Sequence, residues 1–222
     1  MSINWKEKAA EIKVKLDGRA FVNGARVHAH DNDTFACISP LDGQKLIDVA
    51  RCKKADVDAA VKVARAAFED GRWAHLSPKK RKETLIKFAD LIVANAHELA
   101  VTETLDMGKP VSNALAVDVN AAQNTIRWFG EAIDKVYDEV APTPRDSLAL
   151  ITREPVGVVA AVVPWNYPLL MTSWKIAPAL ATGNSVILKP SEKSPLTALR
   201  LAELALQAGI PAGVFNVLPG YG

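Results

Sequence analysis

Asn166 is the residue whose type and place in the chain point most directly to catalysis. It lies in VVPWNYPLL, residues 162–170, where Pro164 stops a β-branched apolar run just before the carboxamide. An amide N–H that projects from the end of a buried strand can stabilise an oxyanion, an effect worth about 10²–10³ in rate. An asparagine between prolines can instead bond to the local backbone as a turn residue. The residue types alone favour the turn.

Lys189 and Glu192 follow a second apolar run, with Pro190 and Ser191 between them. A carboxylate accepts hydrogen bonds from both vicinal hydroxyls of a ribose, and an ammonium donates to the same oxygens. Because Glu192 would repel a 2′-phosphate, this pair favours NAD over NADP. The alternative is a solvated Lys189–Glu192 ion pair, with Glu192 in the first turn of a helix. The spacing supports both interpretations equally.

A third apolar run ends in Pro219–Gly222. Gly220 and Gly222 would permit close approach of the backbone to a ligand, although such glycines are more often plain turn residues. The sequence contains neither GxGxxG nor a Walker loop. A dinucleotide site therefore cannot rest on a phosphate-binding fingerprint.

Cys37 and Cys52 are the only thiols, and their spacing matches no metal or redox motif. Neither follows a helix-start pattern or has an obvious base beside it, although His28 and His30 lie near Cys37 in a polar stretch. We expect buried, inert thiols rather than a nucleophile, no metal site, and a reducing cytoplasm as the compartment.

Composition and charge narrow the classes of partner. The 222 residues are 49% hydrophobic and 23% charged, with a formal net charge of +2 and no basic run. This balance removes the electrostatic case for nucleic acid or an anionic membrane. The N-terminal segment is too charged for a signal peptide, and the most apolar run, 156–164, is too short to span a bilayer.

The site residues need a scaffold, and residues 156–222 supply one. Three apolar runs, VGVVAAVV, SVILKP and VFNVLPG, alternate with helical stretches at 169–182 and 195–208. Apolar strands without alternation are buried on both faces, which indicates an α/β fold with a parallel sheet. Ligands of such sheets bind beyond the carboxyl ends of the strands, so we expect the three polar groups to meet at one edge.

The first part of the chain reads as short strands followed by helices. Asn23-Gly24 predicts a hairpin turn, and the turn at 40–44 precedes a strand at 45–50. Ser77-Pro78 and Asn95 with Glu98 predict helix starts, and Gly71 and Gly108 predict ends. The expected buried stripes are Val57, Val61, Ala64, Phe68; Leu85, Phe88, Ala89, Ile92; and, on one long helix, Val119, Ala122, Ile126, Phe129, Ile133, Val136.

The segment APTPRD breaks this long helix. Leu148, Leu150 and Thr152 then alternate with Ala149, Ile151 and Arg153, which predicts a β-ribbon that projects from the body.

Taken together, the strand ends resemble those of a known family. VVPWNYPLLMTSWKIAPALATGNSVILKPSEKSPLTA and GIPAGVFNVLPGYG are similar to the cofactor-binding half of the NAD(P)-dependent aldehyde dehydrogenases. The stretches ETLDMGKP, WFGEAIDKVYDEV and REPVGVV resemble the same family, so the resemblance covers nearly the whole chain. Within the family it is strongest to bacterial enzymes that oxidise γ-glutamyl-γ-aminobutyraldehyde or guanidinobutyraldehyde in polyamine and arginine breakdown.

The resemblance implies a role for each strand end. Asn166 takes the position that helps to hold the oxyanion formed when a cysteine thiolate attacks the aldehyde. Hydride would then pass to NAD, and water would hydrolyse the thioester. The implied cofactor-binding residues are Val162, Val163, Pro164 and Trp165 along the cleft, Lys189 and Glu192 at the adenosine ribose with Ser191 between them, and Gly222 on the adenine side.

The resemblance also implies an organisation. Residues 1–137 would form the N-terminal part of the cofactor-binding domain, 138–155 an oligomerisation ribbon, and 156–222 the first βαβαβ part of a Rossmann-like sheet. Family members are longer, and their nucleophilic cysteine, general base and pyrophosphate-binding helix match nothing before PGYG.

Two hypotheses follow from the absence of a match to these three family elements. The first is that the chain is the N-terminal portion of an aldehyde dehydrogenase that forms a homo-oligomer when full length. On this hypothesis the chain is inactive alone, and its strand at 214–218 is left unpaired. The alternative is a stand-alone, non-catalytic nucleotide-binding or interaction module.

Overall fold

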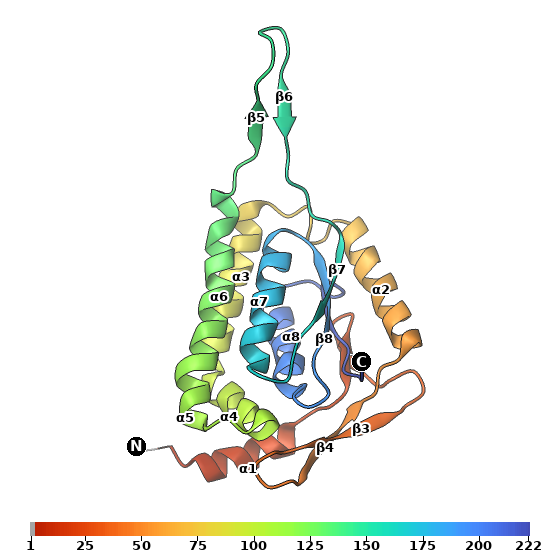
Figure 1. Cartoon of the computed structure of the whole chain (residues 1–222), viewed down its shortest axis with the longest axis vertical. Helices are drawn as coiled ribbons and strands as arrows, with labels where there is room; N and C mark the ends of the chain where they lie inside the picture. The colour runs from red at the N-terminus through yellow and green to blue at the C-terminus, as the bar shows by residue number, and fades with distance from the viewer. Residues whose placement is uncertain (1–2) are drawn as a thin grey trace.

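A mixed five-stranded sheet organises the computed structural model, which describes residues 3–222 (Figure 1). The strand order is β2-β1-β9-β8-β7, in which β7, β8 and β9 are parallel and β1 is antiparallel to both β9 and β2. The parallel strands are those predicted from the apolar runs, so the α/β prediction is confirmed. The strands are β1 Ala20–Val22, β2 Ala25–Val27, β7 Val158–Val162, β8 Ser185–Lys189 and β9 Phe215–Val217.

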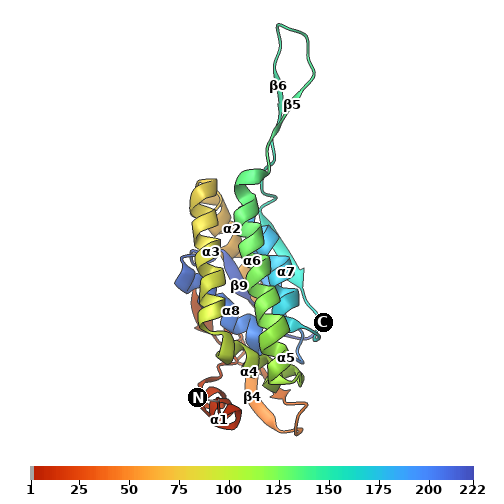
Figure 2. The ribbon, with the colours of Figure 1, turned by 90° about the vertical axis from the view of Figure 1, so that its left-hand side faces the viewer.

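Helices cover both faces of this sheet. Ile187 of β8 packs with Ala60 and Ala64 of α2, whereas Val186 and Leu188 lie in the main core with α7 and α8. Figures 1 and 2 show α3 and α6 side by side as a further layer outside α7 and α8. The bounds are α2 Lys54–Glu69, α3 Pro78–Ala94, α6 Asn120–Ala132, α7 Pro168–Ala181 and α8 Leu196–Ala208.

The N-terminal hairpin closes the edge of β9. Asn23 and Gly24 form the predicted two-residue turn, with φ values of 52° and 78°. Phe21 of β1 pairs with Val217 of β9, and the buried side chain of Asn216 accepts a hydrogen bond from the Asn23 N–H at 3.0 Å. The expectation of an unpaired strand at 214–218 is therefore wrong. Within the described residues, the free edges of the sheet belong to β2 and β7.

α2 forms where it was predicted, but only part of the predicted stripe is buried. Val57 and Val61 are 44% and 43% exposed, whereas Ala60, Ala64 and Ala67 are buried. The small alanines let the helix approach the sheet closely, and the larger side chains of the strands fill the space. Of the predicted stripe, Ala64 is buried and Phe68 is half-buried, but the two valines are wrong, because the three-four spacing occurs on both faces of this alanine-rich helix.

The next two helices follow most of their sequence signals. Ser77 caps α3, since its hydroxyl accepts the Lys80 N–H at 3.3 Å, and the predicted stripe of α3 is buried. α4, Ala96–Met107, ends at Gly108 with a φ of 83°. Asn95 precedes α4 but does not cap it, because its amide donates to the Leu91 carbonyl at 2.7 Å.

The predicted long helix is a series of helical segments. The predicted residues 119–136 begin at the end of the π-helical segment η1, Ala114–Val119, continue through α6 and end just after the 3₁₀ turn η2, Ile133–Lys135. The short helix α5, Val111–Asn113, precedes η1. Val119, Ala122 and Ile126 of the predicted stripe are buried, but Val136 lies beyond η2 and is exposed.

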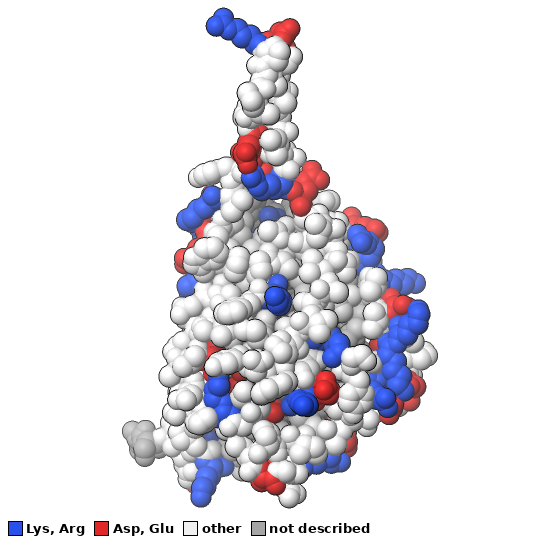
Figure 3. Space-filling view, viewed as in Figure 1, with Lys and Arg blue, Asp and Glu red and all other residues white. Residues whose placement is uncertain are grey.

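The predicted β-ribbon projects well beyond the body of the molecule (Figures 1 and 2). β5, Glu139–Ala141, pairs with β6, Ala149–Ile151, and places Val140 opposite Leu150. These two side chains are 69% and 61% exposed. Figure 3 shows an uncharged stem between charged groups at the tip and at the base of the ribbon. The stem thus exposes apolar side chains to solvent on both strands.

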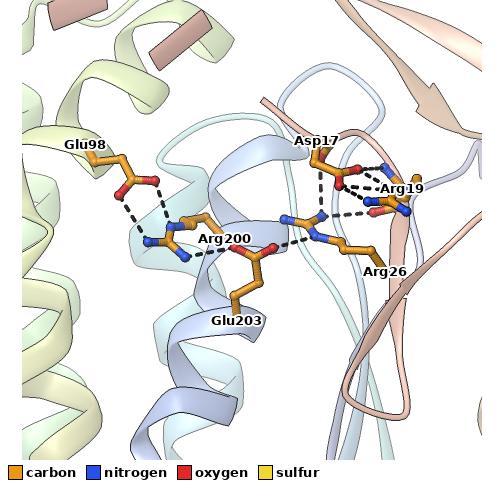
Figure 4. Close-up of polar contacts among 6 residues, drawn as sticks. All are labelled: Asp17, Arg19, Arg26, Glu98, Arg200 and Glu203. Carbon is orange, nitrogen blue, oxygen red and sulfur yellow. Dashed lines mark hydrogen bonds and ion pairs between the residues drawn. The ribbon is translucent and has the colours of Figure 1, made fainter. Parts of the chain in front are cut away.

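A chain of ion pairs fastens the N-terminal segment to α4 and α8 (Figure 4). Arg200 of α8 donates to both carboxylate oxygens of Glu98 on α4, at 2.8 and 3.1 Å, and to Glu203 at 2.9 Å. Glu203 also accepts from Arg26 of β2 at 2.7 Å. Arg26 reaches the carbonyl of Asp17, just after α1, Trp5–Lys15, at 3.2 Å. The bidentate geometry holds α4 firmly against α8.

Candidate active site at the ends of the parallel strands

The carboxyl ends of β7, β8 and β9 meet at one edge of the sheet, as predicted. Val162 is in register with Lys189, and the Val163 N–H donates to the Lys189 carbonyl at 3.1 Å. Trp165, Glu192 and Tyr221, one from beyond each strand end, line a common cleft of about 490 Å³. β3, Thr34–Ile38, which pairs with β4, Lys45–Ala50, contributes to the lining of this cleft.

Aromatic side chains stabilise the β9 side of the cleft. The Tyr221 ring lies 5.4 Å from that of Phe35, and the Arg51 guanidinium lies 4.9 Å from its centroid. A side chain at Gly220 would come within 2.8 Å of the Cys52 carbonyl, so this glycine serves internal packing. Gly222 is exposed with open space around its Cα, and its predicted contact with adenine stays a prediction.

Lys189 and Glu192 do not pair with each other within the described residues. The Lys189 ammonium donates to the neighbouring Pro190 carbonyl at 3.1 Å. Glu192 lies in a turn four residues before α8 begins at Leu196, so it is not in the first turn of that helix. The ion-pair alternative is therefore wrong in both respects. The Ser191 hydroxyl accepts the Lys193 N–H at 3.2 Å, which shapes the turn that carries Glu192.

The residues that follow β7 divide between core and surface. Val163 is 3% exposed and packs in the core, and its predicted contact with the cofactor stays a prediction. Val162 is 68% exposed and Trp165 is 54% exposed, and Pro164 between them is also exposed. The strand end thus presents apolar surface beside the cleft.

Asn166 is exposed at the tip of this turn. The turn is held through its neighbours: the Ser194 hydroxyl donates to the Trp165 carbonyl at 2.9 Å, and the Met171 N–H to the Tyr167 carbonyl at 2.8 Å. Among residues 3–222 the Asn166 carboxamide itself makes no hydrogen bond. A turn asparagine would bond to the local backbone, so this geometry favours a carboxamide that is available to a ligand.

Two acidic residues of α4, which the sequence analysis did not identify as site residues, hold the helices that follow the strand ends. The Asp106 carboxylate accepts the Leu196 N–H at 2.7 Å and the Cys37 thiol at 3.1 Å. Glu103 accepts the Leu169 N–H at 3.4 Å. These carboxyl groups satisfy backbone donors in the first turns of α8 and α7. The sequence signal was present, since ETLD places two acidic residues three apart on an otherwise apolar helix.

Burial controls the protonation of these groups. Burial, with the nearby charge of Asp118, raises the pKa of Glu103 to about 8, and burial raises the pKa of Asp106 to about 7. Burial also raises the pKa of the Cys37 thiol far above its usual range, and that of Cys52 to about 12. Neither thiol ionises near neutral pH, which favours the interpretation of both cysteines as inert.

Residues 3–222 contain no group of three or more His, Cys, Asp or Glu side chains placed to hold a metal ion. Nor does any helix in that range combine the length and the apolar character needed to cross a membrane.

A shallow aromatic hollow of about 570 Å³ lies between α6 and α7. Trp128 and Phe129 of α6 and Trp174 of α7 line it, and the two tryptophans are 63% and 51% exposed. Because α7 begins two residues after Asn166, one helix connects the turn with this hollow.

The chain is similar to known proteins over nearly its whole length. The profile described as "Aldehyde dehydrogenase family" matches residues 27–222. The NADP/NAD-dependent aldehyde dehydrogenase PuuC of Escherichia coli is 54% identical over 98% of this chain and 44% of its own length. Aminoacetaldehyde dehydrogenase of Pseudomonas aeruginosa is 51% identical over 98% of this chain and 44% of its own.

Solved structures agree. The aldehyde dehydrogenase KauB from Pseudomonas aeruginosa is 63% identical, with a TM-score of 0.97 over 99% of this chain and 44% of that one. An indole-3-acetaldehyde dehydrogenase of P. syringae, in complex with NAD⁺, is 60% identical with a TM-score of 0.97 over the same shares. The γ-glutamyl-γ-aminobutyraldehyde dehydrogenase from Burkholderia cenocepacia is 57% identical, with a TM-score of 0.96 over 99% and 44%. The chain thus spans less than half the length of these relatives.

Proposed function

The chain belongs to the aldehyde dehydrogenase family, and we propose that it forms the N-terminal part of an enzyme that oxidises an aldehyde to the carboxylic acid with NAD. One observation carries this proposal. The ends of β7, β8 and β9 place Asn166, Glu192 and the Trp165–Tyr221 cleft at the same edge of the sheet. An exposed amide donor and a nucleotide-sized cleft together suit a cofactor-dependent reaction at a carbonyl.

The polar groups at the end of β8 fit NAD: Glu192 lines the cleft, and Lys189 is the last residue of the strand. Glu192 and Lys189 are not neutralised by each other within residues 3–222, so a carboxylate and an ammonium remain for the ribose hydroxyls. The negative charge of Glu192 would oppose a 2′-phosphate, which supports NAD rather than NADP in this chain. Val162, Pro164 and Trp165 would pack against the cofactor beside β7, and the bound NAD would accept a hydride from the substrate.

Asn166 would act on the aldehyde oxygen. Attack of a thiolate on the carbonyl carbon moves an electron pair onto that oxygen, and the Asn166 N–H would donate a hydrogen bond to the resulting oxyanion. Cys37 and Cys52 are unsuited to the attack, because burial raises the pKa of both thiols. We therefore propose that the nucleophile and the general base come from a part of the enzyme outside residues 1–222. The relatives are more than twice as long as the region that they share with this chain.

The substrate that we propose is an aminoaldehyde of polyamine or arginine catabolism. The names of two relatives support it, aminoacetaldehyde dehydrogenase and γ-glutamyl-γ-aminobutyraldehyde dehydrogenase. The exposed faces of Trp128 and Trp174 are also suited to an ammonium group. The same hollow would also accept an aromatic aldehyde. Indole-3-acetaldehyde, for which one relative is named, is therefore the second candidate substrate.

We also propose that the working protein is a homo-oligomer associated through the β5–β6 ribbon, because the ribbon exposes Val140, Leu148, Leu150 and Ile151. A non-catalytic module remains the alternative. An experiment separates them: fuse residues 1–222 to the C-terminal half of KauB and follow NAD reduction with a panel of aminoaldehydes and indole-3-acetaldehyde. Turnover supports the enzyme, and a folded chimera without turnover, whether or not it binds NAD, supports the module.

A further inference from the structure

The turn that carries Asn166 contains a strained residue. Tyr167 has φ and ψ of 51° and 46°, in the left-handed region, immediately after Asn166 and before Pro168. A bulky non-glycine residue rarely adopts this conformation, and it persists only where the surroundings hold it. The backbone of the turn is therefore fixed by contacts from elsewhere in the fold.

One such contact is made by Lys109, from the loop between α4 and α5. Its ammonium lies 3.6 Å from the centroid of the Tyr167 ring, a close cation–π contact. The same ammonium donates to both carboxylate oxygens of Asp118, each at 2.8 Å. The Lys109 and Asp118 side chains are 14% and 0% exposed, so water competes weakly for the ion pair, whereas the Tyr167 ring on the outer side of the ammonium is 42% exposed.

Asp118 belongs to the π-helical segment η1. The buried residues of η1 are Ala114, Asp118 and Val119, and the wide turn brings the carboxylate to the inside with its apolar neighbours. Isolated π-helical turns occur frequently at functional sites. A fully buried ion pair is weak evidence for stability as such, since an apolar pair of similar size often serves equally well. The presence of this ion pair against the strained residue of the turn therefore calls for a reason other than stability.

We propose that Lys109 and Asp118 are positioning residues for Asn166, with the ammonium clamping the Tyr167 ring so that the carboxamide keeps one orientation at the end of β7. The positioning of Asn166 is independent of the proposed function, and only the expected effect on catalysis rests on it. The turn is anchored on the other side by the fully buried Ser194, whose hydroxyl donates to the Trp165 carbonyl. Asn166 thus lies between two fixed neighbours.

The kinetic test uses the KauB chimera with an aminoaldehyde and NAD. Lys109→Met keeps the stem of the side chain and removes the charge, and we expect kcat to fall about tenfold or more while the KM for NAD changes little. Lys109→Arg should recover most of the loss, because a guanidinium also binds a ring face and a carboxylate. Lys62→Met, at an exposed lysine of α2, is the matched control.

Non-additivity separates positioning from general damage. In an Asn166→Ala background, Lys109→Met should cause no further fall in kcat, because the group that it positions is gone. An additive loss, or an equal loss in NAD binding, contradicts the proposal. Should Lys109→Met fold poorly, Tyr167→Leu keeps the buried ion pair intact and removes only the ring, and the same kcat loss is expected.

A structural readout is independent of the proposed function. The crystal structure of the Lys109→Met protein should show Tyr167 outside the left-handed region or the Asn166 side chain in more than one orientation. An unchanged turn overturns the positioning role whatever the kinetics show. If the turn changes but Asn166→Ala is fully active, the positioning role stands and the catalytic assignment of Asn166 fails.

Discussion

The Asp106 carboxylate accepts the backbone N–H of Leu196 at 2.7 Å and so joins the end of one buried helix to the first turn of another. Asp106 is 1% exposed, so no water replaces this bond if it is lost. The turn that carries Glu192 leads directly into this first turn of α8. Asp106 also contributes to the lining of the cleft, so a buried contact at the cleft wall helps to fix where a proposed cofactor-binding residue lies.

Asp106→Ala should destabilise the protein by about 1–3 kcal/mol, because the Leu196 N–H and the Cys37 thiol lose their acceptor in a dry environment. Asp106→Asn retains an acceptor oxygen for Leu196 and should cost less. Urea unfolding followed by circular dichroism measures both. An alanine variant as stable as the asparagine variant would show that the contact is unimportant.

Glu103→Gln should make folding less sensitive to pH. The pKa of Glu103 is raised from 4.5 to about 8, mainly by burial, so the folded chain keeps a proton that the unfolded chain releases in this window. Stability is therefore fully present below the lower value and falls as the pH rises toward the upper one, by at most about 1.4 kcal/mol per pH unit. A glutamine side chain cannot titrate, so the variant should gain stability relative to the wild type as the pH rises.

The pKa of Asp106 is also raised, to about 7, so the pH dependence of the wild type alone does not isolate Glu103. The quantity to compare is the difference in unfolding free energy between the two proteins. Unfolding free energies of wild type and Glu103→Gln at several pH values across the window provide it. Parallel curves would contradict the assignment of the raised pKa to Glu103.

The ribbon should drive self-association of the chain. Leu150 and Val140 face each other across the two strands and are largely exposed, so Leu150→Lys places a charge in the middle of the apolar surface. We expect this change to weaken association about tenfold or more in sedimentation or light scattering. Val14→Lys on α1, where Val14 is 87% exposed, is the control and should have no effect.

The sequence predicted those elements whose signals are local. The strands β8 and β9 were found because strands buried on both faces are continuously apolar. β7 is equally apolar in sequence, but it lies at the edge of the sheet and is only partly buried. The Asn23-Gly24 turn was found because few dipeptides accept two positive φ values. α3 was found with its buried face because Leu85 and Phe88 make that face much more apolar than the other.

Other features depend on contacts between distant segments. The buried face of α2 was misassigned because alanines and valines occur on both of its sides, and only docking on the sheet selects the alanines. The pairing of Phe21 with Val217 joins residues from the two ends of the chain, and no pattern within either segment specifies it. The contact between Lys109 and Tyr167 has the same character: each residue is ordinary until the fold brings them together.

Glu192→Ala should weaken NAD binding while leaving the chemical step intact. Loss of hydrogen bonds from ribose hydroxyls to a carboxylate costs about 1.5–3 kcal/mol, or roughly 10–100-fold in affinity. In the KauB chimera the KM for NAD should rise, with kcat largely kept at saturation. Glu192→Gln tests the charge separately, and the ratio of NADP to NAD affinity should increase. An unchanged ratio would show that Glu192 does not select the cofactor.

Asn166→Ala should show the opposite pattern. The exposed carboxamide makes no hydrogen bond within residues 3–222, so its loss leaves no buried group unpaired and should barely affect stability. It removes one N–H donor from the proposed oxyanion, which is expected to lower kcat by about 10²–10³, or about 2.7–4 kcal/mol of transition-state stabilisation. NAD affinity should hold, because Asn166 lies beyond β7 whereas Lys189 and Glu192 follow β8. Single-turnover kinetics in the KauB chimera isolate the acylation step, and an unchanged acylation rate would mean that Asn166 is only a turn residue.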